Sequence, residues 1–361
     1  RSDWLRTGPI VSAFERALAD TTGATNAAAV DNGTAALHAA AHAARVGAGA
    51  EVIVPAISWR TSSPPLPHYG LRPKFVEVEL ETLNMDVSRL EQALTPRTRL
   101  LLAVSILGNP AALDVMRAFA DRHGLYFIED NCESLDAELA GRKAGTFGDL
   151  NTSSFFFSHH ISAMEGGMVL TDDLELAHLS RSLRAHGWTR DLPADSPLFQ
   201  RKASDHFEAY RFILPGYNVR PLEFSAAIGR EQLMKLPAMT AARRRNLALF
   251  QKLFQGDERF VIQRENGKSS SFSFTIVLRP ERQPDRDRVF AALKQADIGF
   301  RIITGGCFLR HDAIKYFDYD IVGRIENAYV AHDYGFFVGN HPFDLTPQIE
   351  CLHRVLDRTC R

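Results

Sequence analysis

Apolar runs alternate with amphipathic stretches along the first two thirds of the 361-residue chain, and this alternation constrains the fold more than any other feature. The apolar runs are short and almost continuous, as in strands that are buried on both faces. They cover residues 51–55, 74–80, 99–107, 125–130, 151–157 and 166–171. Helices are expected between them at residues 34–45, 113–123 and 174–185. This alternation predicts an α/β domain with a buried, mostly parallel sheet.

The hydrophobic pattern changes in the last third of the chain. Residues 220–236 and 239–254 each predict a helix, and the second helix is long enough to link two domains. The elements expected beyond it are a half-buried strand at 270–278, a helix at 285–298, a strand at 300–304 and further helix at the end. We therefore expect a large domain over residues 1–238 and a smaller C-terminal α/β domain over residues 239–361.

Charge and cysteine content exclude several classes of protein. The net charge is −1, which does not suggest a nucleic-acid-binding surface. No apolar run approaches the roughly 18 residues of a membrane span, and no signal peptide is visible. Cys132, Cys307, Cys351 and Cys360 are scattered without a C-x-x-C pair or zinc-ligand spacing, so we expect reduced thiols and no metal site. These features predict a cytoplasmic protein without nucleic-acid or membrane partners.

A small-residue motif, "AVDNGTAALHAA" at residues 29–40, leads into the helix expected at residues 34–45. Asn32, Gly33 and Thr34 would allow an anion to approach the amides of the first helical turn, where the helix dipole favours negative charge. The alternative is a plain N-cap made by Asn32 or Thr34. A P-loop lysine and a G-x-G-x-x-G pattern are both missing from the sequence.

Two other motifs follow predicted strands, where α/β proteins bind their ligands. Asp130, in "FIEDNCES", is either a partner for a cationic heterocycle nitrogen or a helix cap. Trp59, in "PAISWR", either stacks on a flat ring or belongs to the core. The turn "GYNVRP" carries Tyr217, Asn218 and Arg220, and it is either an ordinary loop or a phosphate contact.

Two adjacent histidines, His159 and His160, lie in the stretch "SSFFFSHHISAMEGG". Ser154 comes five residues before His159, and Glu165 six residues after it. A lone histidine in a core is usually structural, but a pair between a strand and a Gly-Gly turn indicates a functional role.

Taken in order, these motifs resemble the DegT/DnrJ/EryC1/StrS family of pyridoxal-phosphate-dependent sugar aminotransferases. The matching motifs are N-G-T-A-A-L at 32–37, P-A-x-S-W at 55–59, E-D at 129–130, S-F at 154–155, E-G-G at 165–167, R-x-H-G at 184–187 and G-Y-N-x-R at 216–220. The resemblance covers nearly the whole chain. It implies the fold-type-I architecture, in which a large αβα-sandwich domain with a mostly parallel sheet precedes a smaller C-terminal α/β domain.

The resemblance also implies roles for individual residues. The amides around Gly33 and Thr34, together with Ser154, would hold the cofactor phosphate. Asp130 would pair with the pyridinium nitrogen, and Trp59 would stack on the ring. Because members of the family are homodimers with shared active sites, Asn218 would reach the phosphate in the neighbouring subunit.

Two residues depart from the usual family pattern. His159 occupies the position of the Schiff-base lysine, and Glu133 replaces a glutamine. At both positions the chain resembles a subgroup of 3-dehydratases that take part in the synthesis of colitose, an O-antigen sugar of lipopolysaccharide. This implies removal of the C3 hydroxyl from a nucleotide-linked 4-keto-6-deoxyhexose, with GDP-4-keto-6-deoxymannose as the substrate. The products would be a 4-keto-3,6-dideoxy sugar and ammonia, and L-glutamate would regenerate pyridoxamine phosphate.

Histidine suits such a reaction because it titrates near neutrality but forms no stable imine with the cofactor aldehyde. His159 is therefore the candidate catalytic proton shuttle, and the cofactor would be held without a covalent bond. Glu133 would either tune the protonation of the cofactor's phenolic oxygen or simply form a hydrogen bond with it. Glu165 is expected to stabilise the Gly-Gly turn. The remaining candidates for contact with substrate are Ser158, His160, His186, Tyr217, Arg220 and His341.

Three alternatives to this hypothesis remain. A second class of 3-dehydratase uses an iron–sulfur cluster held by cysteines that include a C-x-C pair, whereas Cys351 and Cys360 stand nine residues apart, so we expect no cluster. A plain nucleotide-sugar aminotransferase would need a lysine, but Lys143 and Lys202, the nearest to His159 in sequence, lie in no motif. A cofactor-binding regulator would need a DNA-binding domain and a basic surface, which the sequence lacks.

Overall fold

The computed structural model describes residue 5 and residues 7–360, and its centre is an eight-stranded sheet. The strands are β1 (Asn26–Val30), β2 (Glu51–Pro55), β3 (Arg72–Val76), β4 (Thr98–Val104), β5 (Tyr126–Asp130), β8 (Leu150–Ser154), β9 (Gly167–Thr171) and β13 (Asp320–Ile321). Their order is β1-β9-β8-β5-β4-β2-β3-β13. From β8 to β13 all neighbours are parallel, and β9 is antiparallel to both β8 and β1. The predicted mostly parallel sheet is confirmed.

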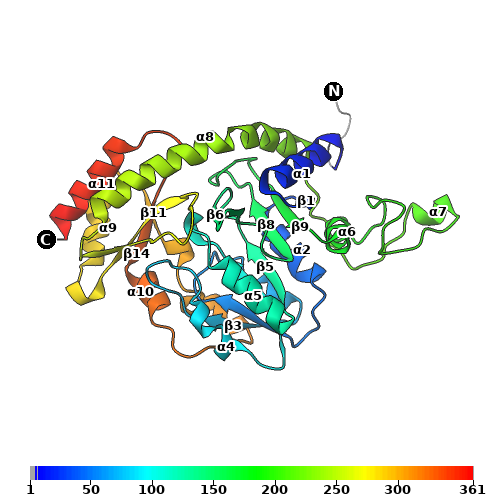
Figure 1. Cartoon of the computed structure of the whole chain (residues 1–361), viewed down its shortest axis with the longest axis horizontal. Coiled ribbons are helices and arrows are strands. Elements are labelled where there is room, and N and C mark those ends of the chain that lie inside the picture. Colours follow the sequence, from blue (N-terminus) through cyan, green and yellow to red (C-terminus); the bar gives the residue numbers. More distant parts are fainter. Residues whose placement is uncertain (1–4, 6, 361) are drawn as a thin grey trace.

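Helices cover both faces of this sheet (Figure 1). They include α1 (Pro9–Thr22), α2 (Gly33–Ala43), α3 (Pro65–His68), α4 (Leu90–Ala93), α5 (Leu113–His123) and α6 (Leu174–Leu183). Successive strand residues point to opposite faces, so Val52 and Val54 pack with α2 and α6, whereas Ile53 packs with α5. Burial on both faces explains why the strands read as continuous apolar runs.

Several predicted strands end earlier than expected, and two of these ends lie at the carboxyl edge of the large sheet, beside the site. The run at 99–107 leaves the sheet after Val104, and the run at 151–157 leaves it after Ser154. In both places the chain turns away at the carboxyl edge of the sheet, so the residues that follow are free to line a site there.

A single helix, α8 (Glu223–Phe254), spans 32 residues and crosses the molecule from α1 to the C-terminal part (Figure 1). The prediction of separate helices at 220–236 and 239–254 is therefore wrong. Pro237 lies inside the helix, where it removes one hydrogen-bond donor. Packing against α1 and α11 (Thr346–Thr359) keeps the helix continuous.

A second sheet of four antiparallel strands forms the C-terminal part, with α9 (Arg286–Gln295), α10 (Asn327–Tyr334) and α11 around it. Its order is β10 (Phe260–Ile262), β11 (Ser273–Leu278), β14 (Gly335–Gly339) and β12 (Phe300–Ile302). The prediction of a half-buried strand at 270–278 is wrong, because β11 is buried on both faces. Phe274 and Ile276 pack with α8 and α11, while Val277 packs with residues of the first sheet's domain such as Ile57.

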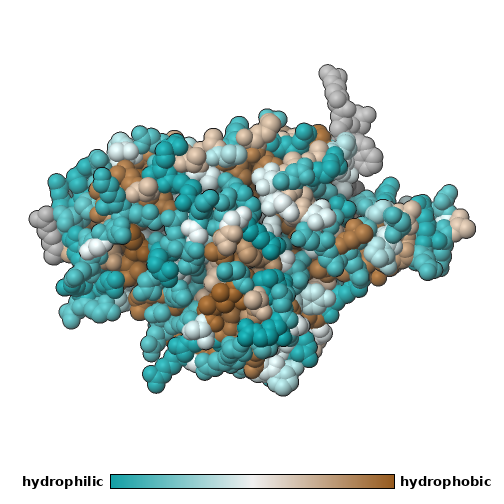
Figure 2. Space-filling model, in the orientation of Figure 1, coloured by the Kyte–Doolittle hydropathy of each residue, from teal (hydrophilic) through white to brown (hydrophobic). Residues whose placement is uncertain are grey.

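An arm that follows α6 projects from the body and carries the short helix α7 (Asp205–Glu208) near its end (Figure 1). Figure 2 shows hydrophobic surface along this arm, and the exposed side chains of the arm include Tyr210 and Phe212.

Among the helices of the described residues, none is long and apolar enough to cross a bilayer. The division of the chain at residues 238 and 239 stays a prediction, and β13 brings two C-terminal residues to the edge of the first sheet.

Candidate active site

A cavity of about 490 Å³ opens at the carboxyl edge of the large sheet, where Val104, Asp130 and Ser154 end their strands. Many of the predicted site residues line it. These are Gly33, Thr34, Trp59, Asp130, Glu133, Ser154, Ser158 and His159. The sequence motifs, although separated by up to 126 residues (33 to 159), therefore meet in one place.

The N-terminus of α2 points at this cavity and has the form of an anion cradle. Asn32 caps the helix, since its side chain accepts a hydrogen bond from the Ala35 amide at 2.8 Å. A Cβ atom on Gly33 would lie 2.6 Å from Cβ of Ser154, so only glycine allows strand and helix to approach this closely. The amides of Gly33 and Thr34 belong to the first helical turn, which has no intrahelical acceptors for them. This arrangement fits a phosphate group.

Asp130 and Trp59 face the same cavity from the ends of β5 and β2. The Ser62 hydroxyl donates to one carboxylate oxygen of Asp130 at 2.7 Å, and the Cys132 amide donates to the other at 3.1 Å. The Asp130 carboxylate is buried and held in one orientation by these donors. Trp59 leaves 48% of its surface exposed on the cavity wall, as a stacking platform for a flat ring requires.

Glu133 also lines the cavity, and its carboxylate accepts a hydrogen bond from the Leu107 amide at 2.9 Å. Withdrawal from water raises the pKa of Glu133 to about 7, and the nearby Asp130 carboxylate acts in the same direction. This carboxyl group therefore exists in both protonation states near neutral pH.

The His159 imidazole is oriented by the backbone of its own motif. Nδ1 lies 3.2 Å from the carbonyl oxygen of Ser154, and since a carbonyl only accepts, Nδ1 carries the proton. The neutral ring then presents a basic Nε2. Burial lowers the pKa of His159, opposed by the Ser154 carbonyl and the Asp130 charge, so the ring is neutral at pH 7. Phe156 and Phe272 pack edge-on against it.

His160, a candidate for contact with substrate, does not line the cavity, whereas Glu165 does. His160 is buried behind the cavity wall, where Nε2 faces the carbonyl oxygen of Ser270. Glu165 lines the cavity with an exposed side chain, and its expected role in stabilising the Gly-Gly turn stays a prediction. Close backbone approach also constrains the turn, since a Cβ on Gly167 would lie 2.2 Å from the Asn32 carbonyl oxygen.

His186, Tyr217, Asn218 and Arg220 form a second group, outside the lining of this cavity. The His186 amide donates to the Tyr217 carbonyl at 2.6 Å, and the Arg220 guanidinium donates to the Asn218 side chain at 3.1 Å. The Tyr217 hydroxyl forms a hydrogen bond with that of Tyr69. The structure thus brings these four residues together but not to the cavity of the same chain.

His341 lies apart from both groups. Its exposed ring stacks on Phe343, and its carbonyl accepts a hydrogen bond from Asn246 in α8. The structure does not bring it to the cavity.

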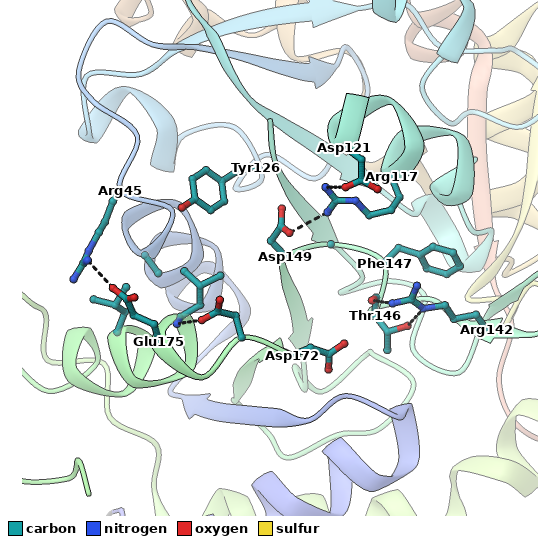
Figure 3. Close-up of a pocket in the computed structure, with 15 residues that line it drawn as sticks. Arg45, Arg117, Asp121, Tyr126, Arg142, Thr146, Phe147, Asp149, Asp172 and Glu175 are labelled. Carbon is teal, nitrogen blue, oxygen red and sulfur yellow. Dashed lines mark hydrogen bonds and ion pairs between the residues drawn. The ribbon is translucent and has the colours of Figure 1, made fainter. Parts of the chain in front are cut away.

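Another hollow, of about 460 Å³, lies at the opposite edge of the same sheet (Figure 3). The charged side chains that line it include two ion pairs: Arg45 with Glu175 at 3.0 Å, and Arg117 with Asp149 at 3.1 Å. None of the predicted site residues lies there.

Four residues of the second sheet's region complete the wall of the first cavity: Phe272, Arg301, Thr304 and Phe337. Sequence reasoning missed them because no local signal sets them apart from other strand residues. It also missed Ser62, which holds Asp130. Among the described residues that line this cavity there is no lysine.

Comparisons with known proteins agree with this geometry. The model of the DegT/DnrJ/EryC1/StrS aminotransferase family matches residues 1–334. A GDP-4-keto-6-deoxy-D-mannose 3-dehydratase from Yersinia pseudotuberculosis is 46% identical over 86% of this chain and 79% of its own length. The solved structure of the Escherichia coli enzyme of that name with bound hydrated PLP is 41% identical, with a TM-score of 0.95 over 98% of this chain and 92% of the other.

A further structure of a GDP-4-keto-6-deoxymannose-3-dehydratase contains a trapped PLP-glutamate geminal diamine. It is 40% identical, with a TM-score of 0.95 over 98% of this chain and 93% of the other. The family model covers far more than half of the chain, and the fold and the motifs of the cavity agree with it. The protein is therefore a member of the DegT/DnrJ/EryC1/StrS aminotransferase family.

Proposed function

We propose that this protein removes the C3 hydroxyl of a nucleotide-linked 4-keto-6-deoxyhexose, with GDP-4-keto-6-deoxy-D-mannose as the substrate. The products are the 4-keto-3,6-dideoxy sugar and ammonia, and L-glutamate is the amino donor, leaving as 2-oxoglutarate. The observation that carries the proposal is His159 on the wall of a cavity that no described lysine lines. The names of the similar proteins, which specify this substrate, PLP and glutamate, support it.

The cavity residues fit pyridoxal phosphate and pyridoxamine phosphate. Gly33, Thr34 and Ser154 would hold the phosphate, Trp59 would stack on the ring, and the Asp130 carboxylate would keep the pyridine nitrogen protonated. When bound, pyridoxamine phosphate supplies an amine that condenses with the C4 ketone and a protonated ring that withdraws electrons.

His159 would move the proton that the elimination requires. Its Nε2 would take a proton from the carbon that bears the cofactor amine and would return it to the departing C3 hydroxyl oxygen. The Ser154 carbonyl keeps Nδ1 protonated throughout, so one nitrogen does all the transfer. Because His159 forms no imine, the amine of the cofactor stays available to the ketosugar.

Glu133 would contact the phenolic oxygen of the cofactor. With its pKa raised to about 7 by burial, it can share a proton with that oxygen at neutral pH. Ser158 lies beside His159 on the wall and would contact the sugar.

A homodimer with shared active sites is part of the proposal. Asn218 is exposed and lies outside the cavity of its own chain, as a residue that reaches the phosphate of a partner's cofactor must be. His186, Tyr217 and Arg220 accompany it and would face the partner's substrate. A cytoplasmic location fits an enzyme that uses nucleotide sugars and glutamate.

The test is incubation of the protein with pyridoxal phosphate, L-glutamate and either GDP-4-keto-6-deoxymannose or a CDP-linked ketosugar. We expect ammonia and 2-oxoglutarate in equal amounts, and a GDP-sugar product that has lost one oxygen by mass spectrometry. Release of an amino sugar instead, or the absence of ammonia, would overturn the proposal. Borohydride should leave the protein without covalently attached cofactor, in contrast to an aminotransferase.

A further inference from the structure

His160, the second histidine of the pair, faces the segment of residues 269–272 that leads into β11. The side chain is 3% exposed, and its Nε2 lies 3.3 Å from the carbonyl oxygen of Ser270. Since this oxygen only accepts, Nε2 carries a proton and donates it. Burial lowers the pKa of His160 well below its usual value, and the charge of Arg243 acts in the same direction. The ring is therefore a neutral, fixed donor.

The segment that accepts this bond is attached to the large domain at several points. The Ser270 amide donates to the Gly108 carbonyl at 2.9 Å, and the Phe272 amide donates to the Leu107 carbonyl at 3.2 Å. A Cβ on Gly108 would lie 2.5 Å from the Phe272 nitrogen, so the two backbones are in direct contact. Leu107, held at a φ of 55°, also donates its amide to Glu133. The segment is thus joined to the wall of the active-site cavity.

Phe272 connects the two histidines. Its ring packs edge-on against His159, with centroids 5.6 Å apart, and lies tilted at 54° to His160, with centroids 5.7 Å apart. Phe272 also lines the cavity. From the other side, Arg243 of α8 donates to the Phe272 carbonyl at 3.4 Å. A shift of this segment would therefore move the ring that packs against His159.

We propose that His160 is a positioning residue. By donating from Nε2 to the Ser270 carbonyl, it holds Phe272 against His159 and keeps Nε2 of His159 directed into the cavity. This inference rests on the proposed function only where it concerns the rate of dehydration, because that rate depends on proton transfer by His159. The contact between the histidines and Phe272 can be tested without the dehydration.

The first experiment compares His160→Gln with His160→Leu in the protein loaded with cofactor. Glutamine can place an amide hydrogen where Nε2 stands, whereas leucine keeps the bulk and removes the donor. We expect His160→Gln to stay within about 3-fold of the parent and His160→Leu to lower kcat by between about 10- and 100-fold with little change in KM. Equal loss in both variants, or a loss confined to KM, would overturn the proposal. If His160→Leu does not fold, His160→Asn replaces it, because its amide falls short of Ser270.

The second experiment adds Phe272→Leu alone and together with His160→Leu. If His160 acts through Phe272, the double variant is no slower than the more impaired single variant. Multiplied losses would contradict this, since they would mean that the two residues act independently.

The third readout is the titration of His159, followed by NMR of histidines labelled at the ring carbon and assigned with His159→Asn. We expect His160→Leu to shift the midpoint of His159 toward 6.5, because a displaced Phe272 admits water, and His160→Gln to leave it unchanged. Parent-like titration in both variants would overturn the positioning role. If the parent protein released no ammonia from any ketosugar, the proposed function would fail, but this titration would still decide the role of His160.

Discussion

The two edges of the large sheet carry hollows of similar size but opposite chemistry. At the amino edge, Arg45 and Arg117 are neutralised by Glu175 and Asp149, so the charged groups there satisfy one another (Figure 3). At the carboxyl edge, backbone and hydroxyl groups hold Asp130 and His159 from behind, which leaves reactive atoms toward the cavity. This contrast shows that a polar lining alone does not identify an active site. The deciding property is whether neighbouring groups pair with the reactive atoms of a polar side chain or hold it so that those atoms face the cavity.

The largest effect is expected at His159. His159→Asn keeps a donor for the Ser154 carbonyl but has no base, so kcat should fall by between about 10² and 10⁴. Steady-state rates of 2-oxoglutarate and ammonia release measure this. The cofactor absorbance of the variant serves as the control for binding. A variant that keeps more than a tenth of the parent rate would show that the carboxyl edge has another base.

A change of chemistry is expected from His159→Lys combined with Ser158→Asn. Aminotransferases often carry Asn-Lys at these positions, and a lysine here would reach the cofactor aldehyde. The variant should turn yellow with pyridoxal phosphate and keep the cofactor covalently after borohydride, as mass spectrometry of the intact protein can detect. The matched control is Arg117→Lys at the amino edge, which should remain unlabelled. A colourless, unlabelled double variant would mean that His159 does not occupy the lysine position.

Gly33→Ala should weaken the cofactor site. The added methyl group would lie 2.6 Å from Cβ of Ser154 and push apart the two elements that form the phosphate cradle. We expect the Kd for pyridoxamine phosphate, measured by absorbance titration, to rise by about 10-fold or more, or roughly 1.4 kcal/mol. Gly47→Ala is the control, because nothing lies within 4 Å of its added atom. Equal Kd values for the two variants would show that the N-terminus of α2 does not bind the cofactor phosphate.

Glu133→Gln should change how stability depends on pH. The folded pKa of about 7 lies above the unfolded value of 4.5, so ionising Glu133 opposes folding. The parent has this penalty in full above pH 7 and loses it as pH falls toward 4.5. We expect the unfolding temperature of the variant to exceed that of the parent by more at pH 8 than at pH 5. Glu129, whose pKa burial also raises to about 7, is present in both proteins and cancels. A difference that is the same at both pH values would contradict a raised pKa.

The smallest effect is expected at the amino edge. Arg45→Gln breaks an ion pair whose partners are each about half exposed, so the free energy of unfolding should change by less than about 1 kcal/mol. Denaturant unfolding and the rate of ammonia release should both match the parent within error. A clear loss of activity would contradict the view that only the carboxyl edge contributes to activity, and it would indicate a function for the hollow in Figure 3.

Much of the site was predictable because its signals are local. Gly33 and Thr34 mark the start of a predicted helix, and Asp130 ends an apolar run. His159 lies in the family motif between Ser154 and the Gly-Gly turn. In a parallel sheet such positions meet at one edge, so the motifs had to converge once the strands were identified. The structure places them together as expected.

Other features depend on contacts between distant segments. The continuity of α8 through Pro237 and the complete burial of β11 follow from packing against α1, α11 and the large domain, which no local pattern encodes. The position of His160 is similar, since its hydrogen-bond acceptor, Ser270, lies 110 residues further along the chain.

The fold class and the family motifs could be read from the sequence alone, as could the prediction that His159 stands at the lysine position, because each rests on short-range pattern and residue chemistry. Which atoms of those residues face the cavity depends on the tertiary structure. It directs Nδ1 of His159 to a carbonyl, raises the pKa of Glu133 by burial and brings Phe272 over from the second sheet's region. Orientation and burial are properties of the surrounding packing, and therefore they appear only when the chain has folded.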